Sequence, residues 1–144
     1  MKSAYILDAI RTPIGSFGGS LSNLRADDLA TVPLKALMER NPKVDWEQVE
    51  DVILGCANQA GEDNRNIARM ALLLAGLPYK IGGETINRLC SSGMAASIHA
   101  YRSISLTEGD LFITGGVEHM TRGPLVISKA SKAFGRDVEM YDSS

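Results

Sequence analysis

The sequence predicts an α/β fold in which a largely parallel, mixed sheet is covered by helices. Short β-rich runs alternate with segments of helical periodicity along the 144 residues. The 14 glycines cluster at turns, where tight connections between strands and helices need them. Such alternation is typical of strand–helix–strand units. Ligands of such sheets bind beyond the carboxyl ends of the strands, so we expect a site there.

Four strands are expected, each from a short β-rich run. The first covers residues 3–10, ends at Arg11-Thr12-Pro13 and leads into a glycine-rich loop. The other three cover 50–57, 82–87 and 110–116.

Three helices are expected between these strands, over 27–40, 66–75 and 91–107. Asp27 lies in the first turn of the first helix, where an acidic group favours the helix dipole. Gly76 follows the second helix and is a suitable stop residue.

Composition excludes several classes of protein. The net charge of −2 and the pI of about 5.7 argue against a nucleic-acid partner. No apolar run is long enough to predict a membrane span. Cys56 and Cys90 do not form a disulfide framework, and the first residues lack the apolar core of a secretory signal, so we expect a cytoplasmic protein. The two histidines, His99 and His119, lack ligand spacing, so no metal site is expected.

The stretch "ETINRLCSSGMAAS" places Cys90 between a strand and the start of a helix. Unpaired N–H groups at a helix N-terminus stabilise a thiolate, and they also stabilise the oxyanion that forms when a thiolate attacks a carbonyl. The small residues that follow give a substrate access to the sulfur. Cys90 is therefore a candidate nucleophile.

A second interpretation of Cys90 stays open. Cys90, Met94, Ile98 and Tyr101 recur at helical spacing and form an apolar stripe that we expect to face the core. Cys90 would then lie at the edge of the buried face. This position suits catalysis, but it also suits an inert core cysteine.

A nucleophilic cysteine needs a base or another way of becoming a thiolate. His119, just past the fourth strand, is the candidate base; the alternative is a solvated loop histidine. His99 lies too far along the third helix, and Cys56 is expected in the core.

Three segments resemble signatures of the thiolase family, in order and spacing. "NRLCSSGMAA" is similar to the nucleophile signature, with Cys90 at the acyl-accepting position. "RTPIGSFGG" resembles the N-terminal signature, and "GGVEHM" resembles the segment after the fourth strand. The resemblance extends over the whole chain.

The resemblance implies a protein of two similar α/β halves, each a mixed five-stranded sheet with helices, and a loop domain inserted in the first half. Residues 1–118 would be the first core domain without its last strand, and 119–144 the beginning of the loop domain. The second half is absent from this sequence. The implied activity is acyl-CoA C-acyl transfer, with coenzyme A as a substrate and no further cofactor, in a homodimer or homotetramer.

For the site, the resemblance implies that the Cys90 thiolate accepts the acyl group and that its backbone N–H lines an oxyanion hole. The activating histidine, an asparagine-held water and an acid/base cysteine come from the missing half. This weakens the hypothesis that His119 is the base, and Cys56 does not match the second cysteine. We therefore expect negligible activity from this chain alone.

"GCANQAGEDNRNIARMA" and "SKAFGRDVEMYDSS" look most like the segments of thiolases that cleave 3-oxoadipyl-CoA. A substrate with a distal carboxylate needs a cation, which Arg65 or Arg69 would supply; the alternative is that both arginines pack locally. Met120 is a further candidate for contact with the substrate.

Residues 122–136 carry basic side chains and no acid, which suits the phosphates of coenzyme A. The candidates are Lys129, Lys132 and Arg136. The alternative is a solvated basic surface.

Two other functions remain open from the sequence. A condensing ketosynthase of the same superfamily also places a cysteine at a helix start, but usually lacks the segments "RTPIGSFGG" and "GGVEHM". A non-catalytic association module would pair copies through the strand "GGETIN".

Overall fold

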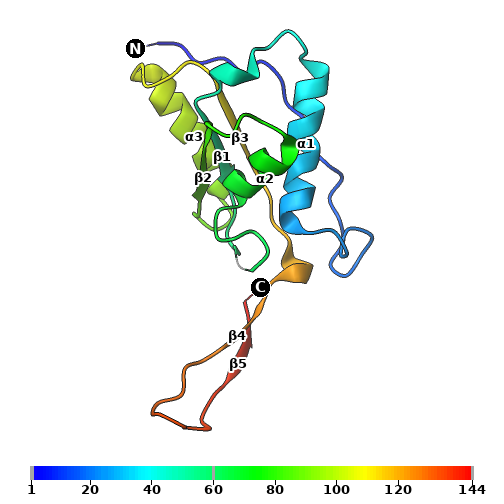
Figure 1. Cartoon of the computed structure of the whole chain (residues 1–144), viewed down its shortest axis with the longest axis vertical. Coiled ribbons are helices and arrows are strands. Elements are labelled where there is room, and N and C mark those ends of the chain that lie inside the picture. Colours follow the sequence, from blue (N-terminus) through cyan, green and yellow to red (C-terminus); the bar gives the residue numbers. More distant parts are fainter. Residues whose placement is uncertain (1, 60, 144) are drawn as a thin grey trace.

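The computed structural model of the chain describes residues 2–59 and 61–143. Its centre is a parallel sheet with the order β2-β1-β3, which confirms the predicted fold class. The strands are β1 (Asp51–Gly55), β2 (Gly82–Ile86) and β3 (Phe112–Gly116). Because all three strands run in the same direction, their carboxyl ends meet at one edge (Figure 1).

Helices cover both faces of this sheet (Figure 1). Side chains alternate along β1, so Val52 and Leu54 pack in the larger core with α1 (Ala26–Arg40) and α2 (Ile67–Ala75). Ile53 faces the other way and packs against α3 (Ser92–Ser105). Short 3₁₀ turns, Trp46–Gln48 and Met120–Arg122, precede β1 and follow β3. In the described part of the chain, no helix is long and apolar enough to cross a membrane.

All three predicted helices and three of the four predicted strands are confirmed, with ends that differ by a few residues. The predicted stop at Gly76 is also confirmed. Gly76 adopts φ +85° after α2 and donates its N–H to the carbonyls of Leu72 and Leu73. Asn66 begins the same helix, because its side chain accepts a hydrogen bond from the N–H of Arg69.

The prediction of a strand over residues 3–10 is wrong for this structure. The segment has no paired strand, although its composition favours extended backbone, and the side chains of Tyr5, Ile6 and Leu7 are exposed. A cavity of about 1360 Å³ lies between it and β3, and β3 pairs only with β1 within the described residues. A segment whose composition favours a strand still forms no ladder of hydrogen bonds when no other strand lies beside it.

The predicted buried stripe of α3 is also wrong. Met94 and Tyr101 are 68% and 56% exposed, whereas Ala96 and Ala100 on another face pack against Ile53. The face of α3 that packs on the sheet consists of small residues, which meet larger side chains of the sheet such as Ile53. The larger apolar side chains of Met94 and Tyr101 are therefore left exposed.

The weakly patterned C-terminal segment contains a hairpin that the sequence analysis did not predict. Antiparallel strands β4 (Leu125–Ile127) and β5 (Met140–Asp142) pair in register, and Figure 1 shows the hairpin projecting from the body of the molecule. All six of its strand residues are exposed, so no periodic burial marks them in the sequence.

The first turn of α3 depends on Gly55. A Cβ atom at position 55 would lie 2.2 Å from the carbonyl carbon of Ser92 and 2.3 Å from the N atom of Gly93. We predict that Gly55→Ala lowers the free energy of unfolding by about 3 kcal/mol, because α3 must move off the sheet. Urea unfolding measures this change.

Gly115→Ala is the matched control, since a Cβ there meets only the side chain of Leu54 at 3.5 Å. We expect it to cost less than about 1 kcal/mol. Equal losses in the two variants would contradict the close-packing argument.

Candidate active site

Cys90 lies at the carboxyl edge of the sheet, where the ends of all three strands are tied together. The N–H of Val117 donates to the carbonyl of Gly55, and the N–H of Cys56 donates to the carbonyl of Ile86, both at 3.0 Å. Cys90 is exposed and precedes the first residue of α3 by two positions. The expectation that it sits at the edge of the buried face is therefore wrong, and the thiol is open to a ligand.

A tight turn presents Cys90. Leu89 adopts φ +52°, which is uncommon for a residue other than glycine. The N–H groups of Ser91 and Ser92 donate to the carbonyls of Arg88 and Leu89, both at 3.1 Å. These two amides are thus already used by the turn. An oxyanion here must use other N–H groups, such as that of Cys90 itself.

Ser92 closes this turn with its side chain. Its Oγ accepts a hydrogen bond from the N–H of Arg88 at 2.8 Å and donates to the carbonyl of Leu89 at 2.6 Å. Ser92 is buried, so these bonds are shielded from water.

Cys56 is buried in the core as predicted. Desolvation, with the nearby carboxylates of Glu118 and Asp63, raises the pKa of its thiol to about 12. Cys56 is therefore an inert thiol near neutral pH, in contrast to the exposed Cys90.

The two histidines are engaged elsewhere. His119 Nε2 lies 3.1 Å from the carbonyl oxygen of Leu21, which ties this ring to the glycine-rich loop. His99 Nδ1 lies 3.1 Å from Glu84 Oε2, on the outer side of β2. The structure supplies no contact between either ring and Cys90.

The two arginines that were candidates for a substrate carboxylate differ in their surroundings. The guanidinium of Arg69 donates to the carbonyls of Tyr79 and Ile81 and so holds the turn before β2. Arg65 is exposed, with φ +63°, and among the described residues its side chain makes no hydrogen bond or ion pair. Arg65 is thus the freer cation.

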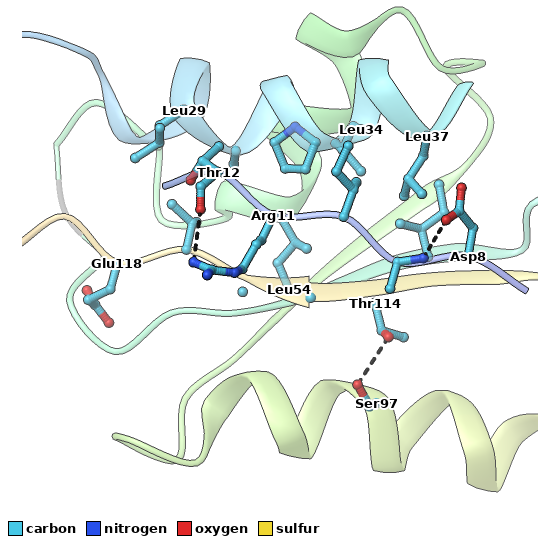
Figure 2. A pocket seen from close by; sticks show the side chains of 18 of the residues that line it. Asp8, Arg11, Thr12, Leu29, Leu34, Leu37, Leu54, Ser97, Thr114 and Glu118 are labelled. Carbon is cyan, nitrogen blue, oxygen red and sulfur yellow. Dashed lines mark hydrogen bonds between the residues drawn. The ribbon is translucent and has the colours of Figure 1, made fainter. Parts of the chain in front are cut away.

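Met120 lines the large cavity, at the start of the 3₁₀ turn that follows β3. Figure 2 shows side chains that line this cavity, from the extended N-terminal segment, α1, β3 and α3. Two of them, Ser97 of α3 and Thr114 of β3, are hydrogen-bonded to each other at 3.2 Å. Glu118, labelled in Figure 2, also lines the cavity. Cys90 is not among the described residues that line the cavity.

The loop between β4 and β5 carries three exposed basic residues, Lys129, Lys132 and Arg136. Arg122 belongs to the same basic stretch, but Glu62 holds its guanidinium at 2.7–3.0 Å. That arginine is therefore not free to bind a phosphate.

An ionic cluster missed by the sequence analysis braces the loop after β1. Arg25 makes a two-fold hydrogen bond to the buried carboxylate of Asp27 at 2.9–3.0 Å and donates to the carbonyl of Glu62. The Glu62 carboxylate in turn accepts the N–H of Ala26 at 2.8 Å. These partners are 36 or more residues apart except for the Arg25–Asp27 pair, so no local pattern predicts them.

Comparisons with known proteins fit this arrangement. The model of the thiolase N-terminal domain matches residues 4–143. The chain belongs to the thiolase family. This match decides against the ketosynthase interpretation, since the thiolase signature around Cys90 lies inside the matched span.

Relatives and a solved structure give the same result. The chain is 62% identical to a β-ketoadipyl-CoA thiolase of Pseudomonas knackmussii and 60% identical to the 3-oxoadipyl-CoA/3-oxo-5,6-dehydrosuberyl-CoA thiolase of Escherichia coli, over 99% and 100% of its length. The crystal structure of a Bacillus anthracis acetyl-CoA acetyltransferase superposes with a TM-score of 0.89 at 37% identity, over 99% of this chain. The chain spans 36% of the length of each.

The two thiols should differ sharply in reactivity. We predict that iodoacetamide at about pH 8, near the ordinary thiol pKa, labels Cys90 and spares Cys56, whose pKa is about 12. Mass spectrometry of the digested protein measures the labelling. In urea both thiols should react, which serves as the control, and equal labelling of the folded chain would contradict the burial argument.

The ionic cluster predicts acid sensitivity. Burial opposes ionisation of Asp27, but the bonds and charge of Arg25 outweigh it and lower the pKa of Asp27; the bonds from Arg122 lower the pKa of Glu62. A lowered pKa stabilises the fold above the ordinary carboxyl pKa of about 4, and this stability is lost as the pH falls through the folded-state value.

Urea unfolding between about pH 5 and pH 2 measures this loss. Glu62→Gln should reduce the dependence on pH, because it removes one of the two titrating groups. An unchanged slope in that variant would show that other carboxyl groups cause the acid sensitivity.

Proposed function

We propose that this chain supplies the nucleophilic half of a thiolase active site, with Cys90 as the residue that accepts the acyl group. The observation that carries the proposal is the position of Cys90, exposed on a strained turn at the start of α3 and at the carboxyl edge of the sheet. A thiol there is accessible to a thioester substrate, and the backbone N–H of Cys90 itself lies just before a helix start.

The proposed reaction begins with attack of the Cys90 thiolate on the 3-keto carbon of a 3-oxoacyl-CoA. The bond between C2 and C3 breaks, acetyl-CoA leaves as an enolate, and a proton is added to its carbon. The thiolate of coenzyme A then attacks the acyl-Cys90 thioester, which releases the shortened acyl-CoA and restores Cys90. The histidine, asparagine and second cysteine that the family resemblance assigns to these proton transfers lie outside this sequence, so we propose that the chain alone has negligible activity.

We propose 3-oxoadipyl-CoA as the substrate, on the support of the names of the relatives that are 60% and 62% identical. Its distal carboxylate needs a cation. Arg65 is the preferred candidate, because its guanidinium has no bond within the described residues, whereas that of Arg69 is committed to two carbonyls. Met120 is proposed as an apolar contact for the acyl chain.

We propose that residues 119–144 begin a loop domain that binds coenzyme A and follows the core domain of residues 1–118. The projecting hairpin and its exposed cations support this proposal. Lys129, Lys132 and Arg136 would contact the phosphates.

The whole protein is proposed to be a cytoplasmic homodimer or homotetramer. Both described cysteines are free thiols, which fits a reducing compartment. β2 is an edge strand and pairs only with β1 in the described part of the chain, so its other edge is available to a second copy.

A chimera tests the proposed function. This chain would replace the aligned N-terminal third of the Escherichia coli relative, to which it is 60% identical. We predict that the chimera cleaves 3-oxoadipyl-CoA with coenzyme A and that Cys90→Ala lowers kcat at least about a thousandfold, because the nucleophile is lost.

Cys56→Ser is the matched control, since it changes the other thiol and should leave most of the turnover of the folded chimera intact. Turnover that survives Cys90→Ala would overturn the role of Cys90. Robust thiolysis by the 144-residue chain alone would overturn its proposed dependence on groups from outside.

A further inference from the structure

The peptide groups of Ala57 connect the ends of all three strands. The N–H of Ala57 donates to Glu118 Oε2 at 2.8 Å, just past β3. Its carbonyl accepts a hydrogen bond from Asn87 Nδ2 at 3.0 Å, just past β2. Glu118 also accepts the N–H of Asn58 at 3.1 Å, so one carboxylate holds two successive amides of the loop after β1.

Asn87 continues this connection into the turn that carries Cys90. Its Oδ1 accepts the N–H of Leu89 at 2.9 Å, and Leu89 is the residue at φ +52°. Strained backbone persists only where several interactions fix it. Asn87 and the buried hydroxyl of Ser92 fix this turn from its two ends.

We propose that Asn87 is a positioning residue for Cys90 and that Glu118 anchors it through Ala57. The proposal rests on the proposed function of Cys90 as nucleophile. The side chain at position 87 must donate to one peptide and accept from another at once, which a carboxamide does and a carboxylate does not. Without it the turn is free to relax, and the position of the sulfur before α3 is no longer fixed.

Labelling of this chain tests the proposal directly. We expect the rate of Cys90 alkylation by iodoacetamide to fall about fivefold in Asn87→Ala, which corresponds to the net free energy of about one hydrogen bond in the turn that presents the sulfur. Asn87→Asp keeps the acceptor for Leu89 but loses the donor to Ala57, so its rate should lie between those of Asn87→Ala and the wild type.

Asn66→Ala is the matched control for a general structural effect. Asn66 also donates to a carbonyl, that of Gly83 at 2.9 Å, and accepts an N–H, that of Arg69 at 3.2 Å, but it caps α2. Asn66→Ala should lower the urea midpoint at least as much as Asn87→Ala and leave the alkylation rate of Cys90 within about twofold of the wild type.

Glu118→Gln tests the anchor, because it replaces one of the two accepting oxygens by an NH₂ group, which cannot accept the N–H of Ala57 or Asn58. It should slow alkylation of Cys90, and combined with Asn87→Ala it should add less than the product of the two single effects. Equal rates in Asn87→Ala and the wild type, or equal slowing by Asn66→Ala, would overturn the positioning role.

The outcome is separable from that of the proposed function. If Asn87→Ala leaves alkylation unchanged while thiolysis by the chimera depends on Cys90, the positioning role alone fails. If thiolysis survives Cys90→Ala, the proposed function fails, whatever Asn87 does to alkylation.

Discussion

The contact between the backbone of Gly55 and the first turn of α3 determines much of this structure. It places the start of the helix directly on the end of β1, with no room for a side chain between them. Ala96 and Ala100 continue the close approach along the helix. The turn before α3 follows the end of β2 and so lies at the carboxyl edge of the sheet, where Cys90 is exposed.

Hydrogen bonds turn this packing into a defined site. Strand ends are normally followed by mobile loops, yet the loops after β1 and β2 are joined here through the peptide groups of Ala57. Asn87 donates and accepts with its carboxamide, and the carboxylate of Glu118 accepts two N–H groups. The same edge therefore combines a strained turn with the exposed thiol of Cys90, while burial raises the pKa of the second thiol, Cys56.

The region beside β3, the strand at the other end of the sheet from β2, is less tightly packed. β3 borders a large cavity, and the extended N-terminal segment lies on the far side of it without a paired strand. Exposed apolar side chains such as Ile6 line this region. The two regions meet at Glu118, which lines the cavity and also accepts the N–H of Ala57 at the carboxyl edge of the sheet.

The sequence by itself determined the α/β class, the three helices and the three paired strands, because these follow from local periodicity and from caps such as Gly76. Its signatures also singled out Cys90 and the family to which the chain belongs. The structure alone decided which face of α3 is buried, since the helix–sheet distance is set by glycines far away in the sequence. It also decided that residues 3–10 form no strand, that Arg69 is committed to a turn, and that Asn87 and Glu118 meet at Ala57. These depend on partners brought together only by folding, and no periodicity records them.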